Sequence, residues 1–456
     1  MALTESVPTA PPPGHEGILR RQAQRESAAR TYARSLPIVP VRARGLTIEG
    51  ADGRRYLDCL SGAGALALGH NHPVVLEAVR TVLDSGAPLH VLDLATPVKD
   101  AFVTELFATL PAELAENARI QFCGPAGTDA VEAALTLVRT ATGRDGLMAF
   151  SGAYHGMTTG ALAASGGARH TTVTRLPYPY DYRCPFGTGG ARGAELAARW
   201  TRSLLDDPGS GVPEPAGLIV EAVQGEGGVI PAPDAWLRRI REITAARGLP
   251  LIVDEIQTGV GRTGAFWAIE HSGIVPDVLV LSKAIGGSLP LAVIVYRKEL
   301  DTWPPGAHAG TFRGNQLAMA AGRATLAHVR ETGLHRHAAA LGARMLARLQ
   351  ALAAAHPCIG DVRGRGLMLG VELIDPEGEA GPAGDLPAAP GLATAVQRAC
   401  LDRGLIVELG GRHRSVIRLL PPLTLTDEQA EAILDRLADA LAAAARPTAG
   451  PTPTTL

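Results

Sequence analysis

The chain has 456 residues, of which 46% are hydrophobic and 19% charged, and its formal net charge at pH 7 is −2. A chain of this length exceeds one compact core, so we expect roughly two to three domains or subdomains. The composition is typical of a globular protein, with no sign of a surface for nucleic acid and no apolar run long enough to span a membrane.

The N-terminal part is expected to be a tail followed by a helix and a hairpin. Residues 1–17 are rich in proline and small polar residues, which predicts disorder, and residues 18–32 could form a basic helical arm. The turn at residues 51–53 predicts a hairpin, and Pro73 suits the first turn of a helix. The N-terminus lacks the pattern of a secretory signal, which favours a cytoplasmic protein. Five cysteines without CxxC spacing argue against a zinc site or disulfides, so we expect no metal.

Strand-length apolar runs alternate with helical patterns from about residue 98 to 330. This alternation predicts a mainly parallel sheet that is covered by helices on both faces. The runs are RIQFC, GLMAF, GLIVEAV, PLIVDE, VLVLSK and PLAVIVY.

Long helices rich in alanine and leucine begin near residue 328, and strand-like segments are interleaved with them. This change predicts a second, α+β domain. Within it, the loop from Asp375 to Pro390 is expected to be a surface insertion.

Two of the strand-length runs end in residues that could share a site. Asp254 follows LPLIV and Lys283 follows DVLVLS, and the carboxyl ends of parallel strands meet at one edge of a sheet. Only three of the 43 basic residues are lysines, so a lysine behind a buried run is unusual. A lysine in a partly apolar pocket can lose its proton and form a Schiff base, as pyridoxal phosphate chemistry requires. The alternatives are a solvated strand-end lysine and an aspartate that caps the next turn.

A glycine-rich turn begins at Cys123 and leads into a helix, where Gly127 and Thr128 could bind a phosphate group. An ordinary helix cap is the alternative. The turn lacks the GKS or GKT ending of a P-loop and is not GxGxxG, so a small phosphorylated ligand fits better than a nucleotide.

Four further segments carry polar residues in glycine-rich or apolar surroundings. Tyr154 and His155 could cover a flat ring, or they could simply pack a loop and cap a helix. Glu226 follows the strand GLIVEAV, and Thr311 precedes a helix start. Arg418 lies in the apolar run VIRLL, where it is either paired internally or held for a substrate carboxylate.

In this order, the motifs GTDA, YHG, EAVQGEGG, VDEIQTGVGRTG, LSKAIGG, GTFRGNQ and IRLLPPL resemble those of the class III (omega-amino-acid) pyridoxal phosphate aminotransferases of fold type I. The resemblance covers residues from about 30 to 440. The variants CGPAGTDAVEAA, PYPYDYRCPFG and GTFRGNQ are similar to those of diaminobutyrate:2-oxoglutarate aminotransferases. Asp129 departs from the glutamate that is commoner in the family and could alter contacts near the phosphate loop.

The resemblance implies an α/β fold with a large domain, built on a mainly parallel seven-stranded sheet, and a smaller α+β domain. The implied division is a tail at 1–17, a segment at 18–75 that contributes to the small domain, a large cofactor-binding domain at 76–327, a small domain at 328–446, and a tail at 447–456.

The resemblance also implies roles for single residues. Lys283 would hold pyridoxal 5'-phosphate covalently and move the proton, Asp254 would keep the pyridine nitrogen protonated, and Gln257 would contact the phenolic oxygen. Arg418 would bind the glutamate carboxylate, and Glu226 would mask that arginine for the other substrate. The other implied cofactor-binding residues are Tyr154 and His155 at the ring, Gly127 and Thr128 at the phosphate, and Thr311, which reaches the phosphate from the other subunit of a homodimer.

The reaction implied is transfer of an amino group from L-glutamate to L-aspartate 4-semialdehyde, which gives L-2,4-diaminobutyrate and 2-oxoglutarate. Other terminal amines, such as 4-aminobutyrate or ornithine, are alternative substrates. An intramolecular aminomutase, which needs no second substrate, and a cofactor-binding protein without catalysis are the further alternatives.

Overall fold

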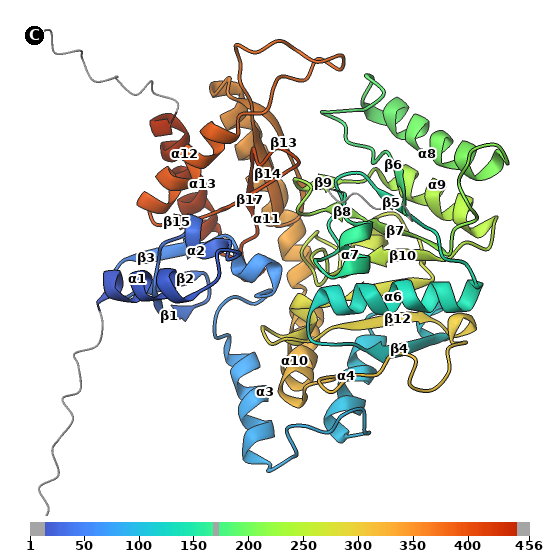
Figure 1. Cartoon of the computed structure of the whole chain (residues 1–456). Coiled ribbons are helices and arrows are strands. Elements are labelled where there is room, and N and C mark those ends of the chain that lie inside the picture. The colour runs from blue at the N-terminus through green and yellow to red at the C-terminus, as the bar shows by residue number, and fades with distance from the viewer. Residues whose placement is uncertain (1–13, 167–172, 445–456) are drawn as a thin grey trace, which may run out of the picture.

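The computed structural model describes residues 14–166 and 173–444 (Figure 1). The disorder expected for residues 1–13 and the tail expected at 447–456 lie outside the described residues. The expected tail was too long, however, because helix α1 (His15–Arg25) begins within it. The helical arm expected at 18–32 is helical only as far as Arg25, and a short helix, α2 (Tyr32–Ser35), follows.

The larger part of the molecule is built on a seven-stranded sheet with the order β4-β12-β11-β10-β7-β5-β6. The predicted seven-stranded, mainly parallel sheet is therefore confirmed. One strand, β12, runs antiparallel to both of its neighbours. The strands are β4 (Ala118–Phe122), β5 (Leu147–Phe150), β6 (Val173–Leu176), β7 (Gly217–Glu221), β10 (Leu251–Asp254), β11 (Val278–Leu281) and β12 (Val293–Arg297).

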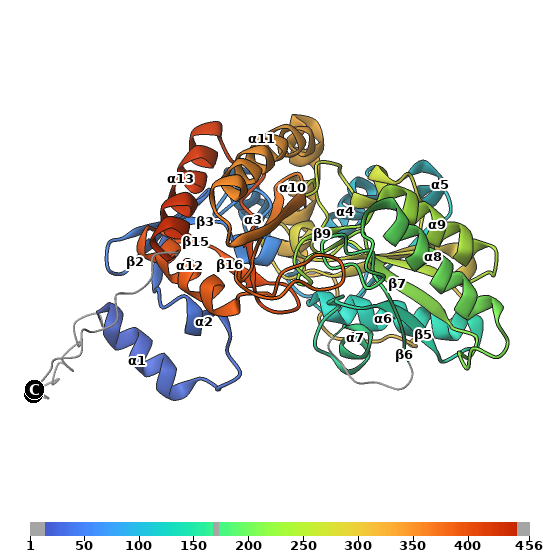
Figure 2. The same cartoon turned by 90° about the horizontal axis from the view of Figure 1, so that it is seen from above.

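Both faces of the central part of this sheet are buried, which explains why its central strands are continuous apolar runs. Every residue of β5, β7, β10 and β11 is buried. Ile252 packs in one hydrophobic cluster, while Leu251 and Val253 pack in another on the opposite face. Figure 2 shows α6 and α7 on one face and α8 and α9 on the other. The helices are α4 (Pro97–Phe107), α5 (Ala112–Ala115), α6 (Gly127–Thr142), α7 (Thr159–Ala164), α8 (Gly190–Asp206) and α9 (Asp234–Ala245).

The smaller part combines the two ends of the chain. Strand β15 pairs in parallel with β3 and so joins the C-terminal region to the N-terminal sheet β1-β2-β3-β15. The expected hairpin is present as β2 and β3, and β1 adds a strand. These strands are β1 (Pro40–Arg44), β2 (Thr47–Gly50), β3 (Arg55–Asp58) and β15 (Leu405–Ile406).

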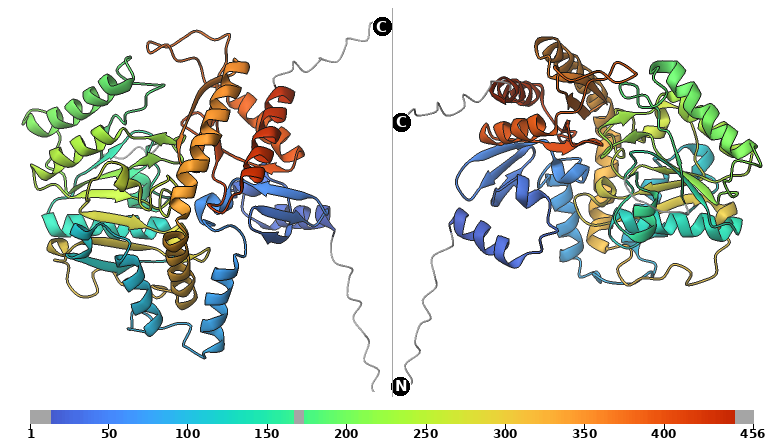
Figure 3. Two further views of the ribbon diagram at one scale, coloured as in Figure 1. Left: turned by 180° about the vertical axis from the view of Figure 1, so that it is seen from behind. Right: turned by 45° about the horizontal axis from the view of Figure 1, so that its top comes forward.

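A second four-stranded sheet, with the order β13-β14-β17-β16, completes the smaller part. The long helices α10 and α11 run between the two parts, in yellow-orange and orange in Figure 3. Because α10 crosses residue 328, the expected domain boundary there stays a prediction. The elements are β13 (Ile359–Arg365), β14 (Met368–Leu373), β16 (Glu408–Gly410), β17 (Val416–Leu419), α3 (Pro73–Asp84), α10 (Gln316–Thr332), α11 (Leu334–Ala355), α12 (Pro390–Asp402) and α13 (Asp427–Ala444).

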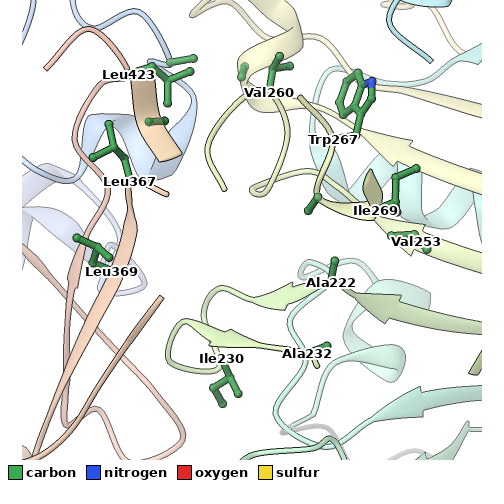
Figure 4. Close-up of a cluster of buried hydrophobic side chains, with 14 of the residues drawn as sticks. Ala222, Ile230, Ala232, Val253, Val260, Trp267, Ile269, Leu367, Leu369 and Leu423 are labelled. Carbon is green, nitrogen blue, oxygen red and sulfur yellow. The ribbon is translucent and has the colours of Figure 1, made fainter. Parts of the chain in front are cut away.

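The hydrophobic core is continuous between the two parts. Figure 4 shows Trp267 and Val260 from a loop of the larger part and Leu369 and Leu423 from the smaller part, and all of them belong to one buried cluster. The carboxyl ends of the parallel strands open beside this junction. In the described ranges, none of the helices is both long and apolar enough to cross a bilayer.

Candidate active site

A cavity of about 280 Å³ lies at the carboxyl ends of the parallel strands. The loops that follow β4, β5, β7, β10 and β11 all contribute to its lining, as expected for a site in a parallel sheet. The structure thus brings together eight of the ten residues proposed from the sequence. These are Gly127, Thr128, Tyr154, His155, Glu226, Asp254, Gln257 and Lys283.

Lys283 is the first residue of a 3-10 turn, Lys283–Gly286, which begins shortly after β11. Its φ of 51° is in the left-handed region, where a side chain costs free energy and where functional residues are often found. Burial lowers the pKa of the Lys283 amine below its ordinary value, and the charge of Glu226 opposes this only in part. The amine is therefore neutral more often than that of a solvated lysine.

Asp254 ends β10, and its carboxylate is held by His155. The Nδ1 atom of His155 lies 2.7 Å from Oδ2 of Asp254, and both residues are buried. The backbone N–H of Ile256 donates to the other carboxylate oxygen at 3.0 Å. Burial favours neutral His155, but the hydrogen bond and the charge of Asp254 outweigh it and raise the pKa of the imidazole. The His155 ring therefore orients Asp254 and does not cap a helix.

The expected phosphate site is the N-terminus of α6. Thr128 Oγ1 lies 2.6 Å from Thr158 Oγ1 and accepts the Thr158 N–H at 3.2 Å, which joins the helix start to the loop after Tyr154. Asp129 Oδ2 accepts the N–H of Ala126 at 3.0 Å, so this shorter acid caps the helix. The first amides of a long helix attract an anion, and the cavity opens beside them.

Arg418 is fully buried on β17, just beyond the cavity lining. Its Nη2 lies 2.7 Å from Oε1 of Glu226 and also contacts Glu408, while its Nη1 lies 3.4 Å from Oε1 of Gln257. We call Glu226, Glu408 and Arg418 the carboxylate–arginine cluster. Burial lowers the pKa of Arg418, but the two carboxylates outweigh this and raise it. Both sequence readings of Arg418 are thus compatible, because it is paired internally and also borders the site.

Sequence reasoning missed Glu408. It lies directly opposite Arg418 in the antiparallel pair β16–β17. The signal was available, because Glu408 interrupts the apolar run LIVEL in the same way that Arg418 interrupts VIRLL. Two opposite charges in neighbouring apolar runs predict a pair.

Glu221 was also missed, although it is the one charged residue within the run GLIVEAV and ends β7. It accepts the N–H of Tyr154 and the N–H of Gly225, each at 3.1 Å, and so connects the loop of Tyr154 with the loop of Glu226. Burial raises the pKa of the Glu221 carboxyl to about 7, with the nearby charge of His155 opposing the shift.

Gln257 reaches the N-terminal segment, where its Nε2 donates to the carbonyl of Ala63 at 3.0 Å. A Cβ atom at Gly225 would lie 1.9 Å from Oε1 of Gln257, so a larger residue there would displace the Gln257 amide. Tyr154 keeps 43% of its surface exposed at the mouth of the cavity, where an aromatic ring can stack on a ligand.

Within one chain, Thr311 does not line the cavity that contains Lys283. It borders a different hollow with His90 and Phe312, and its carbonyl lies 3.1 Å from Nε2 of His90. The surroundings are apolar and exposed: Phe312 keeps 70% of its surface exposed and Leu92 keeps 52%.

Comparisons with known proteins bear on this site. The family model Aminotransferase class-III matches residues 28–441. A diaminobutyrate--2-oxoglutarate aminotransferase of Rhizobium meliloti (strain 1021) is 56% identical over 434 residues, which are 93% of this chain and 92% of that protein. A protein of the same name from Haemophilus influenzae is 46% identical over 430 residues, covering 92% and 94%.

Solved structures agree. An (S)-enantioselective omega-transaminase from Thermomicrobium roseum superimposes with a TM-score of 0.84 at 26% identity, over 95% of this chain and 99% of that one. An amine transaminase from an uncultivated Pseudomonas species in its PLP-bound form gives a TM-score of 0.82 at 29% identity, over 92% and 98%.

Proposed function

The chain belongs to the class-III aminotransferase family, and from that premise we propose that it is a diaminobutyrate--2-oxoglutarate transaminase dependent on pyridoxal 5'-phosphate. It transfers the amino group of L-glutamate to L-aspartate 4-semialdehyde and so forms L-2,4-diaminobutyrate and 2-oxoglutarate. The observation that carries the proposal is the carboxylate–arginine cluster near Lys283, because Glu226 can either cover Arg418 or leave it open to a substrate carboxylate while Glu408 stays in place.

The residues around the cavity fit pyridoxal phosphate. Lys283 offers an amine with a lowered pKa, Asp254 offers a fixed carboxylate, and the start of α6 offers amides for a phosphate. A Cβ at Gly127 would approach Ile256 to 3.0 Å, so glycine lets the start of α6 pack closely against Ile256 in the cavity lining. When bound, this cofactor supplies an electron sink for the carbanion at the reacting carbon.

The residues around the cavity have separate roles in the reaction. Asp254, oriented by His155, would hold a proton on the ring nitrogen. Lys283 would bind the cofactor at rest and would carry the proton to and from the reacting carbon. Tyr154 would cover the ring and exclude water from one side, and Gln257, which lines the same cavity, would donate to an oxygen of the ring.

The two substrates place different groups near Arg418. Glutamate reacts at its α-amino group, so its α-carboxylate lies beside the reacting carbon and pairs with Arg418. Aspartate 4-semialdehyde reacts at its far end, where no carboxylate lies beside the reacting carbon. Glu226 covers Arg418 in that case, since the guanidinium would otherwise lose one of its two buried carboxylate partners with no substrate carboxylate to replace it. Glu226 is 32% exposed and lies in the loop between β8 (Val223–Gln224) and β9 (Ile230–Pro231), so it has room to move.

We propose further that the enzyme is a homodimer in which Thr311 of one chain reaches the phosphate in the other chain's site. The exposed apolar residues around Thr311 support this proposal. The cytoplasmic location stays a prediction.

Half-reactions with single amino donors test the function. L-glutamate, L-2,4-diaminobutyrate, L-ornithine and 4-aminobutyrate are each added to the purified holoenzyme, and the absorbance of the bound cofactor is followed. We expect glutamate and diaminobutyrate to discharge the cofactor much faster than the other two. Discharge by ornithine or 4-aminobutyrate but not by diaminobutyrate would replace our substrate, and discharge by none of the four would reject the transaminase.

A further inference from the structure

Arg418 has two carboxylate partners, although the exchange of substrates described above needs only one. Glu226 and Glu408 both contact its Nη2 atom. One guanidinium and two carboxylates leave the carboxylate–arginine cluster with an excess of one negative charge. The surplus is at the edge of the cavity, because Glu226 lines the cavity and Arg418 contacts Gln257, which also lines it.

Glu408 is fixed in place where Glu226 is not. One of its carboxylate oxygens contacts Arg418, and the other accepts the hydroxyl of Tyr32 at 3.0 Å. Its side chain is only 12% exposed. When Glu226 moves away for glutamate, Glu408 therefore stays on Arg418.

The charge of Glu408 depends on these two partners. Burial raises the pKa of the Glu408 carboxyl and the charge of Glu226 adds to this, whereas the positive charge of Arg418 and the hydrogen bond from Tyr32 oppose the shift in part. The Nε atom of Arg418 is buried beside Gly410 and has no hydrogen-bond partner among the described residues.

The amino donors of this site differ in charge. Diaminobutyrate carries one net positive charge near neutral pH, 4-aminobutyrate is neutral, and glutamate carries one net negative charge. Diaminobutyrate and 4-aminobutyrate have the same chain length from carboxylate to reacting amine and differ only by the ammonium group on the α-carbon. A surplus negative charge attracts that ammonium group through several ångströms of partly desolvated protein.

Resting on the function proposed above, we propose that Glu408 is a specificity-determining residue that favours donors with a second ammonium group over monoamines. The position of Glu226 decides whether Arg418 binds that side chain or a substrate carboxylate. Glu408 supplies the constant negative charge that selects a diamino acid. Tyr32, from the N-terminal segment, positions Glu408 and stabilises its charge.

The test compares wild type, Glu408→Gln and Glu408→Asp in half-reactions with the three donors. The readout is the rate of cofactor discharge per donor concentration, measured at donor concentrations below saturation. For E408Q we expect the rate to fall about tenfold with diaminobutyrate, to change little with 4-aminobutyrate and to rise with glutamate, because the three donors differ in charge. E408D keeps the charge and should keep most of the preference.

Two variants serve as controls. Tyr32→Phe removes one hydrogen bond to Glu408 and should lower the rate with diaminobutyrate by less than E408Q does. Glu431→Gln makes the same chemical change at a surface position, where the side chain is 58% exposed, and should leave all three rates unchanged.

Each outcome decides the proposal. An equal loss with all three donors would show a merely structural role, and unchanged rates would show no role; either result overturns it. If wild type prefers diaminobutyrate and E408Q keeps that preference, only the role of Glu408 fails. If diaminobutyrate does not discharge wild type at all, the function proposed above fails first.

Discussion

Charged side chains that the fold buries next to partners determine the chemistry of the site at the residue scale. Asp254 and Lys283 were predictable, because each ends an apolar run and the ends of parallel strands share one edge. Glu408 and Glu221 were not predicted, since their partners are set by strand register and loop contacts. Apolar neighbours in the sequence indicate that a charged residue is buried. The partner that neutralises its charge is harder to predict, because it depends on the fold.

Replacing Arg418 by glutamine should destabilise the protein, because Glu226 and Glu408 then lose their shared cation. We expect the free energy of unfolding to fall by about 3–5 kcal/mol, as when one partner of a buried ion pair is removed. Urea unfolding measures it. The double variant Arg418→Gln with Glu408→Gln should recover part of the loss, since the buried charge is gone. Equal stability of the single variant and wild type would contradict the pairing.

Glu221 should make the stability depend on pH. Its pKa is about 7 in the folded protein against an ordinary 4.5, so the folded state binds more protons between these values. The contribution of Glu221 to the free energy of unfolding is therefore greatest at or below pH 4.5 and is lost as the pH rises through about 7, by at most about 1.4 kcal/mol per pH unit.

Replacing Glu221 by glutamine tests this dependence. The slope of the free energy of unfolding against pH is compared, because the substitution also changes the absolute stability by leaving one N–H without its acceptor. Denaturant unfolding across that pH range should show a smaller decline for the variant than for wild type. The exposed Glu214→Gln is the control and should keep the wild-type slope. Parallel curves for wild type and Glu221→Gln would mean that Glu221 is ionised throughout.

Strands whose residues form a continuous apolar run were predicted, whereas a strand that mixes apolar and polar residues was not. The buried strands β5, β7, β10 and β11 appear in the sequence as apolar runs. Edge strand β6 was missed, because its two central residues are a threonine and an arginine that are only partly buried. The charges that interrupt β16 and β17 are visible in the sequence, but the strand register that places Glu408 opposite Arg418 is seen only in the sheet.

The loop after β5 and the start of α6 are packed so closely that a methyl group should separate them. Gly156 has a φ of +125°, and a Cβ there would lie 2.4 Å from Thr128 Oγ1. Replacing Gly156 by alanine adds strain of about 1–3 kcal/mol beside the phosphate site, so we expect the cofactor to bind about tenfold more weakly or worse. Cofactor titration of the apoenzyme measures this change.

Gly143→Ala is the matched control for that substitution. Gly143 ends the same helix with a φ of +68°, and a Cβ there meets nothing within 4 Å. Its cofactor affinity should equal that of wild type. If Gly156→Ala also binds normally, the junction is not part of the cofactor site.

The whole molecule depends on contacts between segments that are far apart in the sequence. Strand β15 joins β3, and Tyr32 reaches Glu408, so the N-terminal segment packs against the C-terminal region. Motif order predicted the family and the sheet, but the start of α1 was placed too late because proline-rich composition extends almost to its first residue.

Mixed dimers test whether the site is shared between chains. Thr311→Ala and Lys283→Ala chains, each inactive or weak alone, are mixed after unfolding and refolding. If Thr311 acts in the partner's site, one site of each hybrid has both Lys283 and Thr311, and activity should return to about a quarter of wild type. Thr311→Ala mixed with wild type is the control. No recovery in the first mixture would place both residues in the same site.

The most direct test of the account follows the transferred atom. The enzyme is given L-glutamate labelled with ¹⁵N at its amino group together with L-aspartate 4-semialdehyde, and the product is examined by NMR. We predict that the label appears on C4 of L-2,4-diaminobutyrate, with one 2-oxoglutarate formed for each labelled product. Unlabelled diaminobutyrate, label on the α-nitrogen, or product without 2-oxoglutarate would contradict the proposed transamination.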